Sequence, residues 1–175
     1  MAAFDPTTDD LAYRLLRTGP VTLYWRPALF AETLGLLRAD GYQVVELHAA
    51  AWHSDADLHR DLAAALDFPA YYGRNLDALN DCLRDVTALE YGASPTATGL
   101  VLAFHGYDHY TAASPRSAPI VLDILADHSR RAALTGLRLL TLVQTDDPSF
   151  TLPPLGATQA QWNDAEWLTA SRHPE

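Results

Sequence analysis

Cysteine is nearly absent, since the 175-residue chain contains only Cys82. A single cysteine cannot form an intramolecular disulfide, and it excludes every metal site that needs several thiolates. Lysine is missing altogether, because all 12 basic residues are arginine. No apolar run approaches the ~18 residues that a membrane-spanning helix needs, and the first residues lack the basic-then-apolar pattern of a secretory signal. We therefore expect a cytoplasmic protein with no membrane partner.

Positive charge is also scarce. The chain has 22 acidic residues against 12 basic ones, for a formal net charge of −10. Such a charge repels polyanions, so we expect neither nucleic acid nor an anionic lipid surface as a partner. The excess is uneven, because residues 51–91 carry eight acidic and only three basic residues. A basic protein partner fits this charge, although acidic residues that serve only solubility remain the alternative.

Motifs for catalysis and cofactor binding are missing. The chain has no glycine-rich phosphate loop, no G-x-S-x-G turn and no H-E-x-x-H helix. His105, Asp108 and His109 could hold a metal, but they fall across a strand end and a loop, where their spacing fixes no common face. His53 and His59 lie near an expected helix start and should face solvent. We expect no enzyme activity, no metal and no cofactor.

Apolar runs alternate with helix-like segments along most of the chain. The strand-like runs are Val21–Trp25, Tyr42–Leu47, Leu100–Phe104 and Leu137–Val143. One helical pattern follows a cap at Thr7 or Thr8 and ends at about Arg17, and a second surrounds Leu29–Leu37. Three more helical patterns cover 55–66, follow Asn75 and cover 118–134. Strands that are apolar throughout indicate an α/β fold with a parallel sheet covered by helices. After residue 146 the periodicity fades, and we expect Trp162 and Trp167 to pack a short helix onto the body.

The segment from Tyr71 to Leu83 carries the most information. Asn75 can cap the helix that follows it. Asp77 and Asp81 are four residues apart and stack on one helix face, with Asp85 one turn further. Like charges at that spacing destabilise a helix by a few tenths of a kcal/mol. The residues alone leave two interpretations open, namely an ordinary solvated helix face and an anionic binding surface beside two tyrosines.

A family resemblance rests on this same segment. The run Phe68-Pro-Ala-Tyr-Tyr-Gly-Arg-Asn-Leu-Asp-Ala-Leu-Asn-Asp-Cys-Leu83 resembles the signature of the barstar family, intracellular inhibitors of secreted ribonucleases such as barnase. The order of elements fits over about residues 42–145. The resemblance implies a three-stranded parallel sheet, and we expect Val21–Trp25 to add a fourth strand next to Tyr42–Leu47. Residues 1–41 would then be a helix–strand–helix addition and residues 146–175 a tail, within one domain of residues 1–175.

The resemblance also implies an inhibitory surface. Asp81 would take the place of an RNA phosphate among the basic catalytic residues of the ribonuclease, and Asp77 would pair with an enzyme arginine. Tyr71 would stack near the catalytic histidine, and Asp127 would add an acidic contact from a later helix. Asn80 and Val86 stand where a family member has tryptophans, and Arg74 and Arg84 weaken the acidic potential. The predicted partner-binding residues are Tyr71, Gly73, Asn75, Asp77, Asn80, Asp81, Arg84 and Asp127.

The sequence thus favours an inhibitor of a small, basic, guanyl-type ribonuclease. The alternative is a barstar-like interaction module or immunity protein whose partner is not a ribonuclease.

Overall fold

The protein is an α/β structure built on a parallel sheet, as the apolar strands predict. The computed structural model describes residues 10–173. Within these residues the sheet has five strands, all parallel, in the order β2-β3-β4-β1-β5. The strands are β1 (Val21–Tyr24), β2 (Gln43–Leu47), β3 (Leu100–Phe104), β4 (Leu139–Gln144) and β5 (Gln161–Trp162).

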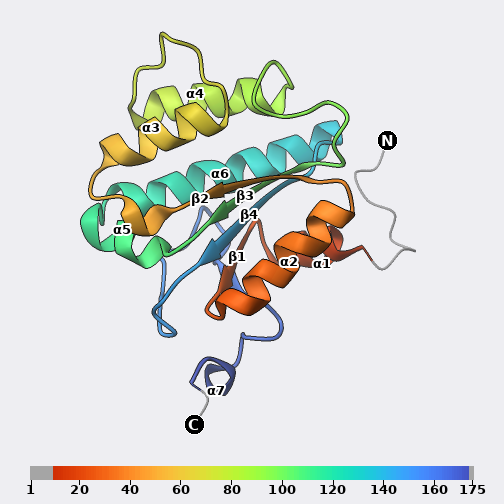
Figure 1. The fold of residues 1–175 in the computed structure, drawn as a ribbon, viewed down its shortest axis with the longest axis vertical. Coiled ribbons are helices and arrows are strands. Elements are labelled where there is room, and N and C mark those ends of the chain that lie inside the picture. Colours follow the sequence, from red (N-terminus) through yellow and green to blue (C-terminus); the bar gives the residue numbers. More distant parts are fainter. Residues whose placement is uncertain (1–9, 174–175) are drawn as a thin grey trace.

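Helices cover both faces of this sheet (Figure 1). Helices α1 and α2 lie on one face, and α3, α4 and α6 lie on the other. None of the helices among residues 10–173 is long and apolar enough to cross a membrane. The helices are α1 (Leu11–Thr18), α2 (Pro27–Ala39), α3 (Asp55–Ala65), α4 (Leu76–Thr87), α5 (Tyr107–Ala113), α6 (Ser117–Thr135) and α7 (Thr169–Arg172), with a short 3-10 helix, η1 (Ala49–Ala51).

The central strands bury side chains on both faces, which explains why they are apolar throughout. On β3, Leu102 and Phe104 point into the larger core beneath α3, α4 and α6. Val101 and Ala103, which alternate with them, point into the smaller core beneath α1 and α2. Each face therefore needs its own layer of helices, and the N-terminal addition supplies one of them.

The expected position of the N-terminal strand is wrong. β1 pairs with β4, with Val21 opposite Thr141, and on its other side with β5. It does not neighbour β2. The reason lies in α2, which crosses the sheet between β1 and β2 and covers the apolar side chains of β3 and β4 with Phe30 and Leu34. A crossover to an adjacent strand would keep α2 away from β3 and β4 and leave their apolar side chains on that face uncovered.

The chain ends also differ from expectation. α1 begins at Leu11, and the Asp10 carboxylate caps it by accepting a hydrogen bond from the Tyr13 amide at 3.2 Å. Asp10 is thus the cap of this helix, and Thr7 and Thr8 lie outside the described residues. Trp162 belongs to β5 rather than to a helix, whereas Trp167 is exposed.

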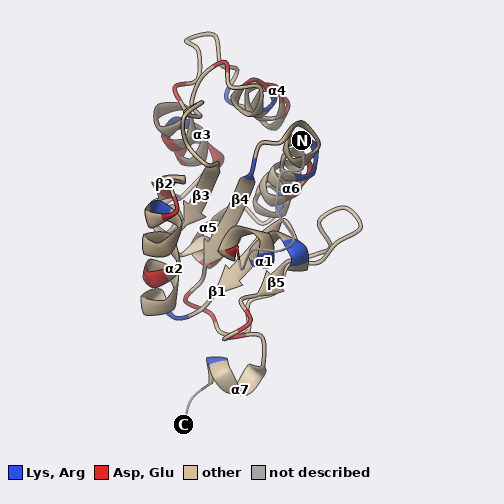
Figure 2. Cartoon of the chain, turned by 90° about the vertical axis from the view of Figure 1, so that its right-hand side faces the viewer, with Lys and Arg blue, Asp and Glu red and all other residues tan. Residues whose placement is uncertain are grey.

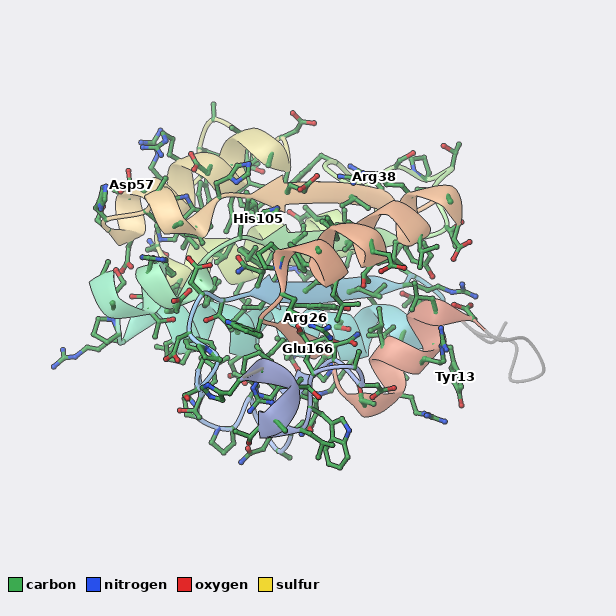
Figure 3. The ribbon with its side chains drawn as sticks, turned by 60° about the horizontal axis from the view of Figure 1, so that its bottom comes forward. Tyr13, Arg26, Arg38, Asp57, His105 and Glu166 are labelled. Carbon is green, nitrogen blue, oxygen red and sulfur yellow. The ribbon has the colours of Figure 1, made fainter. Side chains whose placement is uncertain are left out.

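A buried carboxylate fixes the C-terminal segment to the sheet (Figure 3). Glu166 has no exposed surface. Its Oε2 accepts a hydrogen bond from the Trp25 amide at 2.8 Å, and its Oε1 accepts from the Arg26 amide at 2.7 Å and from Arg26 Nε at 3.0 Å. Glu166 thus satisfies two backbone donors at the point where the chain leaves β1.

Replacing Glu166 by alanine should destabilise the fold. Two backbone amides at the end of β1 would lose their acceptor, and an unsatisfied buried donor costs about 1–3 kcal/mol. We expect Glu166→Ala to lower the free energy of unfolding by about 3 kcal/mol in denaturant titrations. Glu90, an exposed residue after α4, provides the control variant Glu90→Ala. Equal stability of the two variants would show that the carboxylate does not hold the C-terminal segment.

Candidate functional site

The loop that leads into α4 anchors one tyrosine and displays the next. Tyr72 is buried, and its hydroxyl lies 2.5 Å from His59 Nδ1 on α3. Its ring also packs edge-on against Phe68 at 4.8 Å between centroids. The neighbouring Tyr71 is 82% exposed. The loop therefore presents an aromatic ring to solvent from a fixed base.

The start of α4 is built as the sequence predicts. Asn75 Oδ1 accepts a hydrogen bond from the Ala78 amide at 2.8 Å, so Asn75 is the cap. A Cβ added at Gly73 would lie 3.3 Å from Ala78 Cβ and 3.3 Å from Asn75 Nδ2, so a side chain there would crowd the helix start. Arg74 has a φ of +49°, an unfavourable backbone conformation for a residue with a side chain. The loop shape is thus tied to these particular residues.

An acidic row of Asp77, Asp81 and Asp85 follows the outer face of α4. The inner face is buried through Leu79 and Leu83, as predicted. Asp77 lies in the first turn, where the helix dipole favours an anion. Asp81 is 62% exposed at its side chain. The acidic row is therefore accessible to a partner.

Arginine partly neutralises the acidic row. Arg84 lies between two of its carboxylates, with Nη2 at 3.3 Å from Asp81 Oδ1 and Nε at 3.8 Å from Asp85 Oδ1. Acidic and basic residues accordingly occur together on α4 in Figure 2. Exposed ion pairs of this kind contribute at most about 1 kcal/mol. A cation of a partner can therefore compete with Arg84 for Asp81.

Helix α6 completes the site beside α4. His128 is buried, and its Nε2 lies 3.0 Å from Asn80 Oδ1, which ties Asn80 to α6. The next residue towards the N-terminus is Asp127, whose Oδ2 lies 2.8 Å from Arg131 Nε. Arg131 and Arg84 line the same groove. The structure therefore brings Asp127 and Arg84 to the same side of the molecule as Asn80 and Asp81.

His59 is buried rather than solvent-facing, which corrects the expectation from its position near a helix start. Its side chain supports Tyr72 and is 3% exposed. Burial lowers the pKa of His59, and the charge of Arg74 adds to this shift, whereas Asp55 opposes it. The sequence spacing could have predicted this burial, since His59 follows Leu58 and precedes Leu62 by three residues on the apolar face of the helix.

The histidines considered as metal ligands separate in the structure. His105 turns away, with Nε2 at 2.8 Å from Glu46 Oε2. Asp108 and His109 instead meet Asp146, and potential ligand atoms of these three residues lie within 4.8 Å of one another. His109 Nε2 already lies 3.0 Å from Asp146 Oδ2, and Asp108 accepts a hydrogen bond from the Asp146 amide at 3.1 Å. Their hydrogen bonds to one another account for the cluster.

Acidification should destabilise the protein through His59. The unfolded chain takes up a proton on this residue near its ordinary pKa of 6.5, whereas the folded state takes one up only at lower pH. Stability present above about pH 6.5 is therefore lost as the pH falls towards the lowered pKa. We expect His59→Gln to be less stable at pH 7 by about 1–3 kcal/mol, because the imidazole that packs edge-on against Tyr72 and contacts its hydroxyl is lost. Its stability should also depend less on pH between 7 and 5.5.

Urea titrations across this pH range measure both effects. The control is His53→Gln, which removes an exposed histidine close to the same helix and should leave the pH dependence unchanged. A wild-type slope retained in His59→Gln would assign the pH dependence to other groups, such as His128, whose pKa is also lowered by burial.

Comparison with known proteins finds a family match over the segment that contains α4 and α6. A family model described as "Barstar (barnase inhibitor)" matches residues 42–144, which run from β2 to the end of β4 and include α4 and α6. A Bacillus subtilis (strain 168) protein named "Putative ribonuclease inhibitor YrdF" is 77% identical over 26 residues, which cover 15% of this chain and 29% of that protein. The family match extends over more than half of the chain, and the chain therefore belongs to the barstar family.

Proposed function

We propose that this protein inhibits a small basic ribonuclease of the barnase type by covering its phosphate-binding site with the outer face of α4. The observation that carries the proposal is the exposed carboxylate of Asp81 at the middle of α4, with Asp77 one turn before it. Asp127 adds a further carboxylate from α6. The family match and the name of the Bacillus subtilis relative support a ribonuclease as the partner.

The chemistry of this contact is the replacement of a phosphate by a carboxylate. A ribonuclease holds the RNA phosphate with cationic side chains, and a carboxylate offers the same kind of anionic oxygen acceptors. Hydrogen bonds between charged donors and carboxylates are shorter and stronger than neutral ones. Asp81 already lies within ion-pair distance of a guanidinium, that of Arg84. An enzyme arginine could take the same position.

The loop before α4 would supply the contacts around the carboxylates. Tyr71 presents its ring, and Gly73 and Asn75 present backbone and amide groups at the helix start. Tyr72 and its contact with His59 hold this loop in place before any partner arrives. Pre-organisation lowers the entropic cost of binding, since fewer groups have to be ordered in the complex.

The whole chain would act as one domain in the cytoplasm. β1 pairs directly with β4, so the N-terminal addition extends the same sheet that carries the family match. An inhibitor kept inside the cell would protect it from its own ribonuclease. The second candidate is a barstar-like module with a partner other than a ribonuclease, which the neutralising Arg84 and the polar Asn80 favour.

Removing the central carboxylate tests the proposal directly. Asp81→Ala should weaken binding to an inhibited ribonuclease by about 2 kcal/mol or more, on the scale of an interface hot spot, or roughly thirtyfold in Kd. Stability should change little, because Asp81 is exposed and the substitution relieves repulsion with Asp77 and Asp85. Barnase and other small guanyl-type ribonucleases serve as probes, with inhibition and calorimetric binding measured together.

The matched control for charge is Glu32→Ala, which removes an exposed carboxylate from α2 on the opposite face of the sheet. It should bind like the wild type. Undiminished inhibition by Asp81→Ala would refute the proposed site. Wild-type protein that leaves all these ribonucleases active would favour the second candidate.

Salt dependence tests the role of charge in the encounter. The Debye length falls from about 30 Å at 0.01 M salt to about 3 Å at 1 M. An acidic surface that attracts a basic enzyme should therefore associate much more slowly at high salt, whereas dissociation should change less. Stopped-flow fluorescence gives both rates. An association rate that stays flat across this range would mean that the acidic row does not face the enzyme.

A further inference from the structure

A groove borders the acidic row on its C-terminal side. It has a volume of about 570 Å³ and lies between the C-terminal parts of α4 and α6 and the loop of residues 95–98. Its walls combine small apolar side chains with hydroxyl and cationic groups, among them Arg84, Thr87, Ala88, His128, Arg131 and Leu137. The groove and the acidic row thus share one continuous surface.

The groove is basic, in contrast to the row beside it. Its lining residues include two arginines and no carboxylate. Arg84 and Arg131 are 64% and 69% exposed at their side chains. The C-terminal carbonyls of both helices, which would repel an anion, are partly occupied by the chain itself. The Leu137 amide donates to the Ala132 carbonyl at 3.0 Å, and the Ala88 amide donates to the Arg84 carbonyl at 3.0 Å.

Each of these arginines is tied to a carboxylate of the proposed site. Arg84 pairs with Asp81, and Arg131 pairs with Asp127 at 2.8 Å. If cations of a ribonuclease take over Asp81 and Asp127, Arg131 loses its carboxylate partner, and Arg84 keeps only its longer contact with Asp85 at 3.8 Å. Two cations with less compensating charge would then face a basic enzyme, which is unfavourable unless the enzyme supplies negative charge at that point.

We propose that the groove binds an acidic surface loop of the same ribonuclease, whose carboxylate pairs with Arg84 and Arg131. This inference rests on the proposed function. Two features of the surface select this occupant. The groove is continuous with the acidic row, so a ribonuclease on α4 reaches it, and its charge is complementary to a carboxylate. The complex would then exchange ion pairs within the inhibitor for ion pairs across the interface, and the preferred ribonuclease would carry an acidic residue beside its basic cleft.

A different outcome is expected if the two arginines merely weaken the acidic field. In that case, neutralising either one should speed association with a basic enzyme and leave dissociation unchanged. Arg74 provides the comparison, because it precedes the cap of α4 and does not line the groove. Faster dissociation therefore indicates a contact in the groove, whereas faster association alone indicates an effect on the acidic field.

The experiment measures association and dissociation rates for Arg84→Gln, Arg131→Gln and the double variant, with the ribonuclease that the wild type binds most tightly. We expect each single variant to dissociate about tenfold faster, and the double variant faster still. Arg131→Lys, which keeps the charge, should recover part of the loss. Arg74→Gln, whose side chain lies outside the groove, should act mainly by speeding association.

Arg60→Gln is the matched control, since Arg60 is an exposed helical arginine on α3 that also pairs with two aspartates, Asp57 and Asp61. It should leave both rates unchanged. Thermal unfolding of each variant verifies that the fold is intact.

Arg84→Gln and Arg131→Gln variants that dissociate no faster than the wild type would overturn the groove proposal, even where Asp81→Ala weakens binding and so supports the inhibitor function. If Asp81→Ala also leaves binding unchanged, the result would instead count against the proposed function. Failure of the wild type to bind any of these ribonucleases would count against both.

Discussion

The candidate site depends on the apolar contact that holds α4 against the sheet and α6. Leu79, Leu83 and Val86 fill the inner face of α4 and share one core with the apolar stripe of α6. Since the helix is amphipathic, this packing fixes its rotation and turns Asp77 and Asp81 outward. The acidic residues themselves contribute little to stability. Their position follows from buried side chains, so the proposed recognition surface and the folding contacts lie on opposite faces of one short helix.

Polar contacts add to the apolar packing in fixing the position of α4 and of the loop before it. The Asn75 cap sets where α4 starts, and the His59–Tyr72 contact holds the loop before it. On the other side, His128 joins Asn80 to α6. Buried histidines suit these positions because their lowered pKa keeps the rings neutral, and a neutral ring can be buried at low cost. The start and the middle of α4 are thus each tied to a neighbouring element, which favours recognition by pre-formed geometry.

Local features of the sequence predicted much of this arrangement. The cap at Asn75, the buried leucines of α4 and the apolar strands of a parallel sheet all follow from short-range patterns. Two local signals were missed, the burial of His59 and the cap at Asp10. The larger errors concerned contacts between segments far apart in the sequence. Periodicity says that Val21–Tyr24 is a strand but not that it pairs with β4, because the choice depends on how α2 covers the opposite face. The meeting of Asp146 with His109 depends in the same way on the adjacency of β3 and β4.

The part of the chain outside the family match covers an apolar face of the sheet without altering the candidate site. Val101 and Leu140 lie on the sheet face away from α4, and α2 covers them. β1 pairs along β4, and Glu166 fastens the C-terminal segment to the end of β1. These contacts all lie on the far face or at the far edge of the sheet from α4 (Figure 1). Since α1 and α2 pack in the other core, on the opposite face of the sheet from α4, substitutions there should alter stability while leaving the shape and charge of the α4 surface as they are.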